Sequence, residues 1–347
     1  MTFRQKAMKF FVRWHRRLAW LGGAAVLIWG LSGISHPIMS WTGPKATSFF
    51  PPKVTLTPQA LAELPEAAHG LTGLPVSVVK IVASANGPLL QITESQSSPR
   101  RYFDLAAGEW LIDQDAQQAR WLASYYTGRS DDEIIQLEFL DHFTGDYPSV
   151  NRLLPVYKVS FTGDDQLQAY IHTETAALAS LNDATKRKVQ FVFRQLHTWE
   201  FLNVAGFGRA LLIALMMLSL FLMSAAGIGL ILAIKQRKIK DGKRRWHRYL
   251  AYGIWLPLMA WSFSGFYHLF QAELVERVSG MHLDKPVALA EESFSTELDW
   301  LSSYQNKQIR SVSIVRGAGG ENLIRLGLAS RAKQPALNQH SSHHSAQ

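Results

Sequence analysis

Three long apolar stretches stand out along this chain of 347 residues. They run from Leu18 to Met39, from Ala210 to Ile234 and from Tyr249 to Phe270, and none has Asp, Glu, Lys or Arg in its interior. A helix needs about 20 predominantly apolar residues to cross the hydrocarbon core of a bilayer. The pattern therefore predicts a membrane protein with three spanning helices.

Between the first two stretches, apolar and polar residues alternate over much shorter distances, which predicts a small α+β domain. Apolar runs bounded by turn residues predict strands at 76–83, 89–93, 101–105, 156–161 and 167–172. Helical spacing predicts helices at 114–126, 131–140 and 184–196. The expected fold class is a membrane α-helical bundle of three spans, with an external α+β domain between spans 1 and 2.

The basic residues gather on one side of the predicted bundle. Six precede the first span (Arg4, Lys6, Lys9, Arg13, Arg16 and Arg17), and eight lie between the second and third (Lys235, Arg237, Lys238, Lys240, Lys243, Arg244, Arg245 and Arg248). The positive-inside rule makes both segments cytoplasmic. The expected location is thus a bacterial inner membrane, crossed several times, with the N-terminus cytoplasmic and the C-terminus periplasmic.

These features divide the chain into eight regions. We expect a basic cytoplasmic N-terminus (1–17), span 1 (18–40), a periplasmic domain (41–205), span 2 (206–234), a cytoplasmic loop (235–248), span 3 (249–271), a periplasmic segment (272–330) and a polar, disordered tail (331–347). The first span lacks a small-x-small cleavage site and is predicted to stay as an anchor.

Charge and cysteine content exclude several classes of protein. The net charge of +9 follows from the membrane topology and predicts contact with lipid, not with nucleic acid. The absence of cysteine excludes disulfides, iron–sulfur ligation and covalent haem attachment. Any haem in this protein is therefore of the b type.

A duplicated motif carries the candidate chemistry. Trp14, His15 and Arg16 are followed by Ser32, Gly33 and His36, and the same residue types recur as Trp246, His247, Arg248, Ser264, Gly265 and His268. In each copy the two histidines are 21 residues apart, which is a rise of about 31 Å along a helix. Both histidines face the same broad side of their helix. Two such helices side by side offer two stacked histidine pairs, the axial ligand set of two haem b groups.

We predict that His15 and His247 ligate an inner haem, and that His36 and His268 ligate an outer one. The first and third spans run in the same direction, so matching positions lie at equal depth. His197, at the outer start of the second span, is an alternative outer ligand, a propionate partner or a substrate contact. As the plainer alternative, His15 and His247 anchor the helices at the membrane surface beside Trp14 and Trp246, and His197 caps or anchors its own helix.

Several glycine, arginine and aromatic residues each allow a functional and a structural interpretation. Gly33 and Gly265 lie one turn before the outer histidines and leave room either for a flat macrocycle or for close helix packing. Arg16, Arg17, Arg209 and Arg248 are candidates to pair with haem propionates, although topology explains most of them equally well. The external aromatics Trp110, Trp121, Tyr125, Tyr126 and Trp199 form either a substrate surface or a core.

The external domain resembles a known repeat. Residues 154–161 (LPVYKVSF), 168–171 (QAYI) and 196–199 (LHTW) resemble the second PepSY repeat and its approach to the membrane. With the two Trp-His-Arg helices, residues 8–330 resemble the PepSY-associated transmembrane family, which includes ferric-siderophore reductases and iron-regulated inner-membrane proteins. Residues 308–328 look like the beginning of another PepSY unit. Family members commonly have a fourth membrane helix. This chain is therefore expected to be either a three-span variant or the product of a reading frame that ends early.

The resemblance implies an oxidoreductase that reduces a periplasmic acceptor. This acceptor is ferric iron held by a siderophore, or another molecule. Because no flavin or nicotinamide motif is present, electrons are expected from a cytoplasmic or quinol donor. The sequence points to no catalytic residue. A haem-free, membrane-anchored PepSY sensor or interaction protein is the main alternative, and a metal carrier is a weaker one.

Overall fold

The structure is a computed structural model that describes residues 3–54, 58–63, 66–67, 76, 78–95, 97–234, 240–274, 309–316, 319 and 322–328. The predicted tail at 331–347 and much of the predicted segment at 272–330 lie outside these ranges.

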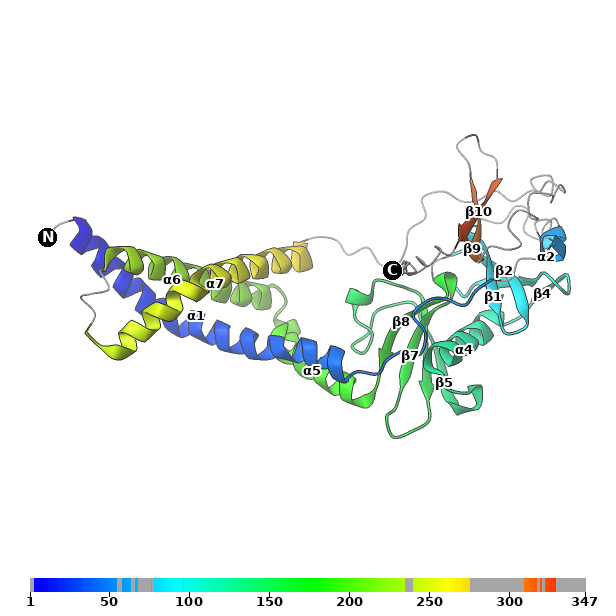
Figure 1. Cartoon of the computed structure of the whole chain (residues 1–347), viewed down its shortest axis with the longest axis horizontal. Coiled ribbons are helices and arrows are strands. Elements are labelled where there is room, and N and C mark those ends of the chain that lie inside the picture. The colour runs from blue at the N-terminus through cyan, green and yellow to red at the C-terminus, as the bar shows by residue number, and fades with distance from the viewer. Residues whose placement is uncertain are drawn as a thin grey trace, which may run out of the picture.

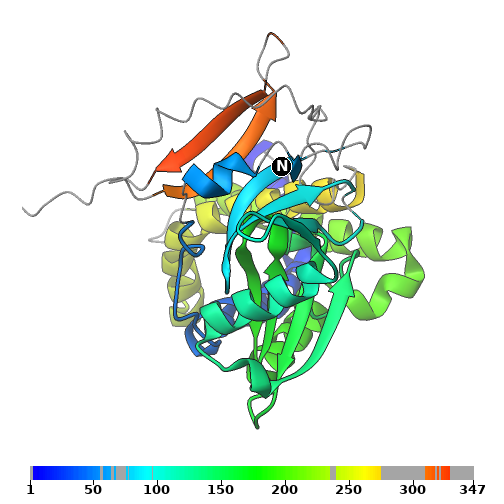
Figure 2. The ribbon, with the colours of Figure 1, turned by 90° about the vertical axis from the view of Figure 1, so that its right-hand side faces the viewer.

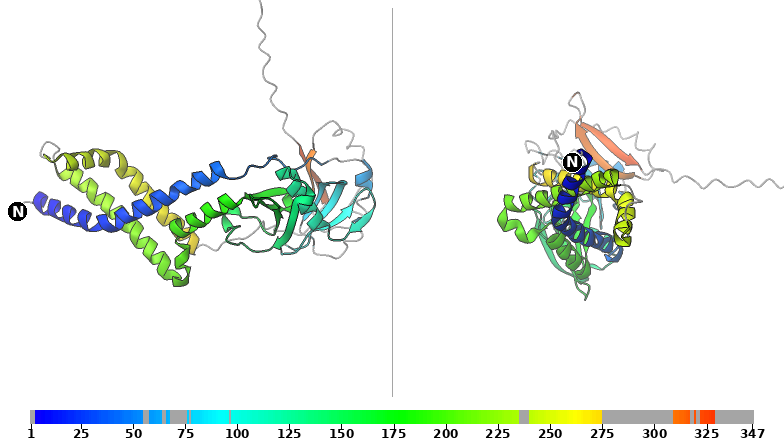
Figure 3. Two further views of the ribbon diagram at one scale, coloured as in Figure 1. Left: turned by 90° about the horizontal axis from the view of Figure 1, so that it is seen from below. Right: turned by 90° about the vertical axis from the view of Figure 1, so that its left-hand side faces the viewer.

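Three long helices form one end of an elongated molecule, and two β-sheets form the other (Figure 1). The helices are α1 (Phe3–Thr42), α6 (Phe207–Ala233) and α7 (Gly242–Leu274), and α6 packs against both of the others. Helices α1 and α7 run toward the sheets and α6 runs away from them (Figures 1 and 3).

Helices α1 and α6 are long and apolar enough to cross a membrane. Helix α7 has the length, with 33 residues, but does not reach the same hydropathy. Its apolar residues are interspersed with Trp, Tyr and Ser and with Pro257, whose hydropathy is low.

Small residues let the three helices approach closely. A Cβ atom on Gly22 would lie 3.2 Å from the Cα of Leu220, and one on Gly229 would lie 2.8 Å from the Phe11 ring. The buried centre of the bundle consists of Ala25, Trp29, Trp199, Met216, Met217 and Leu220. Close packing through glycine is typical of membrane helices, where hydrophobic burial does not drive association.

A six-stranded sheet lies at the end of the molecule far from the bundle, next to the short helix α2 (Pro58–Ala62) (Figure 1). Its strands are β1 (Val78–Ser84), β2 (Gly87–Thr93), β3 (Arg101–Asp104), β4 (Glu109–Leu111), β9 (Ile309–Arg316) and β10 (Asn322–Leu328), in the order β10-β9-β1-β2-β3-β4. Strand β9 pairs antiparallel with β1, with Ile81 opposite Val312 (Figure 2). The segment after α7, predicted as part of a further unit, thus belongs to the sheet that follows α1.

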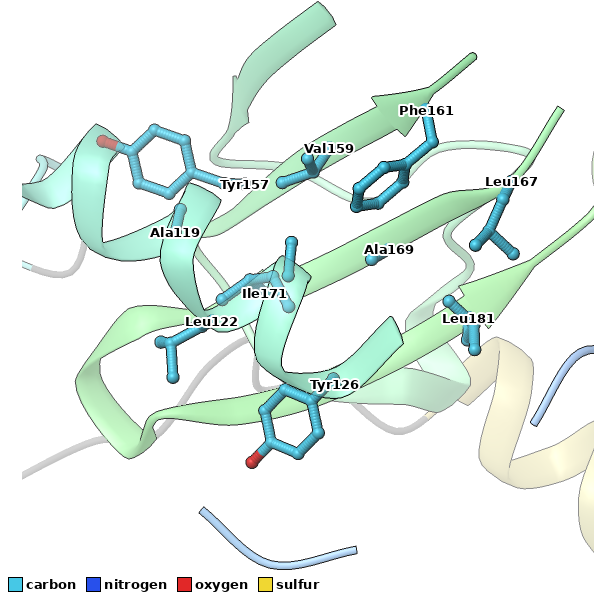
Figure 4. Packing of buried hydrophobic residues seen from close by; sticks show 11 residues of the cluster. Ala119, Leu122, Tyr126, Tyr157, Val159, Phe161, Leu167, Ala169, Ile171 and Leu181 are labelled. Carbon is cyan, nitrogen blue, oxygen red and sulfur yellow. The ribbon is translucent and has the colours of Figure 1, made fainter. Parts of the chain in front are cut away.

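The second sheet has four antiparallel strands with a helix across one face. The strands are β5 (Ile134–Leu140), β6 (Val156–Phe161), β7 (Gln168–His172) and β8 (Ala177–Asn182), and the helix is α4 (Gln114–Thr127). Leu122 and Tyr126 of α4 pack on Val159, Ala169 and Ile171 of the sheet (Figure 4). Helix α5 (Ala184–His197) follows β8 and packs along the C-terminal half of α1 (Figure 1). It confirms the helix predicted at 184–196.

Four short 3₁₀ helices complete the described elements. They are η1 (Asp131–Glu133), η2 (Ser149–Asn151), η3 (Thr173–Thr175) and η4 (Glu200–Ala205).

The predicted helix at 131–140 is wrong. Only its first turn is helical, as η1, where Ser130 and Glu133 form a reciprocal capping box. From Ile134 the chain extends as β5 and pairs with β6, with Leu137 opposite Val159. Two adjacent β-branched residues, Ile134 and Ile135, favour an extended chain, and the partner strand decides between the two structures.

Candidate functional site

The structure brings His15 of α1 and His247 of α7 together at the end of the bundle far from the sheets. Their ring centroids are 6.1 Å apart, and the ring planes are inclined by 61°. The two residues are far apart in sequence, so this contact depends on how α1 and α7 meet, both running toward the sheets (Figure 1). The predicted inner pair is therefore a close pair in space.

His15 is oriented by the backbone of α6. Its Nδ1 lies 2.9 Å from the carbonyl oxygen of Met223. Because a carbonyl only accepts hydrogen bonds, Nδ1 carries the hydrogen, and a neutral ring keeps its lone pair on Nε2. Gly227 lies beside this ring, where a Cβ atom would come 3.4 Å from Cε1 of His15, which is close to an ordinary van der Waals contact.

A cavity of about 600 Å³ lies beside this pair. Its wall includes both histidines, Trp20 and Trp255, and a set of small residues: Ala19, Gly23, Ala24, Ser224, Gly227 and Ala251. Cofactor and ligand pockets are commonly about 300–1,000 Å³ and mostly apolar. The inner site thus combines two imidazoles with room for a bulky apolar group.

The outer histidines lie where the bundle meets the external domain. His36 of α1 and His268 of α7 line one cavity of about 950 Å³. The same cavity is lined by three cations and one carboxylate (Lys186, Arg194, Arg209 and Glu200). It is more polar than the inner cavity, and residues of both the bundle and the sheet end of the molecule line it.

His197, at the end of α5, is held more firmly than the other outer histidines. Its Nδ1 lies 3.0 Å from the hydroxyl of Ser32, and its carbonyl accepts a 2.8 Å bond from the Trp29 indole. The Phe193 ring stacks on it at 4.5 Å and meets His36 edge-on at 6.0 Å. Burial lowers the pKa of His197, and the nearby His36 lowers it further. His36, His197 and His268 all remain candidates for the outer pair.

Both glycines of the duplicated motif face other side chains. A Cβ atom on Gly33 would lie 3.9 Å from Cε1 of His197, and one on Gly265 would lie 2.8 Å from Sδ of Met217. The contact at Gly265 favours the second sequence interpretation, in which glycine allows close helix packing. At Gly33 a Cβ atom would make only an ordinary van der Waals contact, so both interpretations of Gly33 stay open.

The four candidate propionate partners are used in different ways. Arg248 is buried, and its guanidinium donates to the carbonyls of Ile231 and Ile234 at the end of α6. Arg209 donates to the Thr198 carbonyl and pairs with Glu273 of α7 while lining the outer cavity. Arg16 and Arg17 are exposed on α1. Among these four, Arg209 is the one that lines a cavity shared with candidate ligands.

The external aromatics mostly belong to cores. Tyr126 is buried under the four-stranded sheet, with Trp121 and Tyr125 packed around it. Trp199 stacks on Trp29 inside the bundle at 5.4 Å. Trp110 is partly exposed beneath the Arg101 guanidinium, 4.7 Å from the ring centre.

No protein-family model, curated protein or solved structure matches this chain. The functional argument therefore depends on the geometry of the two histidine sites. Within the described ranges no three His, Asp or Glu side chains gather as a metal-binding group.

Sequence reasoning missed the residues that orient these histidines. Met223 contributes through its backbone carbonyl, which no pattern of side chains reveals. Phe193 has no feature in the sequence that distinguishes it from other apolar residues of α5. Gly227 had a signal, because a glycine within a spanning helix often marks a close approach.

Sequence reasoning also missed a buried charged cluster between the two sheets. Arg100 is 4% exposed, and its Nη2 lies 3.3 Å from Nε2 of His172 and 3.6 Å from the Glu174 carboxylate. Lys80 donates to the Glu174 carbonyl at 3.0 Å. Burial, followed by the charges of Arg100 and Lys80, lowers the pKa of His172 to about 3.

Proposed function

We propose that this chain is a bacterial inner-membrane di-haem b protein that passes electrons from a cytoplasmic or quinol donor to a periplasmic acceptor. The acceptor that the family resemblance suggests is ferric iron in a siderophore, which would make the protein an oxidoreductase. The observation that carries the proposal is the His15–His247 pair beside an apolar cavity of about 600 Å³.

The geometry of the inner pair fits axial ligation. Imidazole nitrogen binds metals at about 2.0 Å, so two imidazoles on opposite sides of one iron have ring centroids roughly 6 Å apart. The centroids of His15 and His247 are 6.1 Å apart. The bond from His15 Nδ1 to a backbone carbonyl is the usual outer contact of a ligating histidine. A porphyrin supplies four further ligands, which suits a site with only two protein donors.

Sheet pairing supports a third crossing by α7. If α1 and α6 both cross the membrane, the start of α7 lies on the side opposite the external domain. Strand β9, which follows α7, pairs with β1 of that domain. The chain must therefore cross the membrane again between α6 and β9, and α7, with 33 residues, is long enough to do so.

Haem bound at these sites would supply one-electron transfer. The protein's own residues place the two proposed sites at opposite ends of the bundle. His15 and His247 lie at the predicted cytoplasmic end, and His36, His197 and His268 lie at the domain end. The outer cavity, with Lys186, Arg194 and Arg209 in its wall, suits an anionic, oxygen-rich iron chelate.

A visible spectrum tests the proposal. Full-length protein prepared with ample haem supply should show a sharp Soret band, and dithionite should produce split α bands. Replacing His247 with Ala should remove about half of the haem, because one of two axial pairs is lost. His142→Ala, at an exposed histidine of the external domain, should leave the haem content unchanged.

A colourless protein would contradict the haem proposal and favour the haem-free, membrane-anchored interaction protein. Full haem retention in His247→Ala would contradict the assignment of the inner pair alone.

A further inference from the structure

A shallow basic groove runs along the exposed side of α1 near its N-terminus. The α1 basic groove has a volume of about 620 Å³ and is lined by Met8, Lys9, Val12, Arg13, Arg16, Arg17 and Trp20. Helix α1 contains no Asp or Glu from Phe3 to Thr42, so no acidic residue of its own helix neutralises these cations. The groove is separate from the cavity beside His15 and His247, although Trp20 borders both.

The groove continues along α1 as an apolar stripe. Lys9, Arg13, Arg16 and Trp20 are spaced by 4, 3 and 4 residues, and Trp20 is followed by Leu27, Leu31, Ile34 and Ile38 at spacings of 7, 4, 3 and 4. Such spacings keep residues on one face of a helix. The four aliphatic side chains are 64%, 67%, 56% and 37% exposed. One face of α1 therefore presents cations, then an aromatic ring, then exposed aliphatic side chains.

The arginines of the groove are available for a ligand. Arg13 and Arg16 are exposed and form no hydrogen bond or ion pair with the described residues. The matching position in the second motif behaves differently, because Arg248 is buried and bonded to the end of α6. Membrane topology requires a certain number of positive charges on the cytoplasmic side, but it does not require them on one face above an apolar stripe.

We propose that the α1 basic groove binds an anionic phospholipid of the cytoplasmic leaflet. The lipid phosphate contacts Arg13 and Arg16, the glycerol region lies beside Trp20, and an acyl chain follows Leu27 and Leu31. Four residues of helix separate Arg16 from Trp20, about 6 Å, which places them at headgroup and interface depth respectively. Arginine suits this ligand because its planar fork matches phosphate oxygens.

The inference rests on α1 crossing the membrane, and it does not depend on haem. Lipid binding can be measured on colourless protein, so a failure of the redox proposal leaves this test intact. Recovery of the full-length protein outside the membrane fraction would contradict the membrane topology before any lipid is added.

The test compares phosphatidylglycerol with phosphatidylcholine, added to the full-length protein in a neutral detergent. Native mass spectrometry counts bound lipid, and the melting temperature reports stabilisation. The variant Arg13→Gln/Arg16→Gln should bind phosphatidylglycerol about 10- to 30-fold more weakly, because two basic contacts are lost. Its matched control, Lys243→Gln/Arg244→Gln, removes the same charge at exposed positions in the first turn of α7 and should bind like the original protein.

Equal binding of phosphatidylcholine, or an equal loss in the control variant, would overturn the proposal and leave only a diffuse charge effect. If the double variant fails to fold, Arg16→Gln alone provides the comparison and should show a smaller loss of the same kind.

Discussion

At the scale of single residues, histidine in this molecule serves two opposite purposes. His15 bonds to the Met223 carbonyl and lines an apolar cavity, so its second nitrogen is left for a ligand. His172 has both ring nitrogens engaged, one with Arg100 and the other with the Thr175 hydroxyl. Because arginine only donates, Nε2 of His172 is an acceptor, and the ring is held neutral within the external domain.

His172 should make the stability of the external domain depend on pH. In the unfolded chain this histidine takes up a proton near pH 6.5, whereas the folded state resists protonation until about pH 3. Below about pH 6.5 the unfolded state binds more protons, so the free energy of unfolding falls as pH falls, by up to about 1.4 kcal/mol per pH unit. Urea unfolding at pH 7.5 and 5.5 measures this slope. His172→Gln should reduce it, and an unchanged slope would show that other groups cause the pH dependence.

At the scale of elements, the two copies of the Trp-His-Arg motif have diverged in what their arginines do. The last carbonyls of a helix have no partner within the helix. Arg248 satisfies two of them at the end of α6, and it also donates to the Tyr252 hydroxyl one turn further along α7. It therefore joins α6 to α7 close to His247. Arg16 in α1 has no comparable contact with the described residues.

Replacing Arg248 with Ala should destabilise the bundle by about 1.5–3 kcal/mol, because charge-assisted hydrogen bonds at buried carbonyls are lost. Arg248→Lys should lose less stability than Arg248→Ala, because lysine keeps the positive charge but lacks the planar guanidinium group that bonds two carbonyls at once. Arg16→Ala, at the matching exposed position, should change stability by less than about 0.5 kcal/mol. Thermal unfolding in a neutral detergent without added anionic lipid makes the comparison. Equal effects at the two positions would contradict the cap assigned to Arg248.

At the scale of the whole molecule, one sheet contains a strand that follows the first bundle helix and a strand that follows the last. Strand β1 follows α1 and strand β9 follows α7, yet the two pair with Val79 opposite Ile314. If α1 and α6 both cross a membrane, as we propose, this pairing requires α7 to return the chain to the side of the sheets. The ends of α1 and α7 both lie at the end of the bundle nearest the sheets (Figure 1), and His36 and His268 of these two helices line one cavity.

Single cysteines test this topology, because the chain has none of its own. We expect Asn86→Cys, in the β1–β2 turn, and Leu323→Cys, on β10, to react with a membrane-impermeant maleimide in intact spheroplasts. Lys243→Cys, at the start of α7, should react only after the membrane is opened. Labelling of Leu323→Cys only after opening would show that α7 does not cross. The unsubstituted protein should remain unlabelled throughout.

The sequence alone determined what depends on short-range periodicity and composition. Runs without charge predicted the three long helices, two of which meet the criterion for membrane crossing. The spacing of 21 residues within each motif predicted histidines near both ends of α1 and α7, because a helix converts sequence distance directly into length. Helices α4 and α5 and five of the ten described strands, β1, β2, β3, β6 and β7, were predicted for the same reason.

Only the tertiary structure decided what depends on contacts between distant segments. Residues 134–140 form a strand because β6 pairs with them, and β9 joins β1 across more than half of the chain. The contact of His15 with His247, the carbonyl that orients His15 and the stacking around His197 likewise come from helices that meet only after folding. Periodicity reports which face of an element is apolar, but the identity of the neighbour on that face is set by packing of the whole chain.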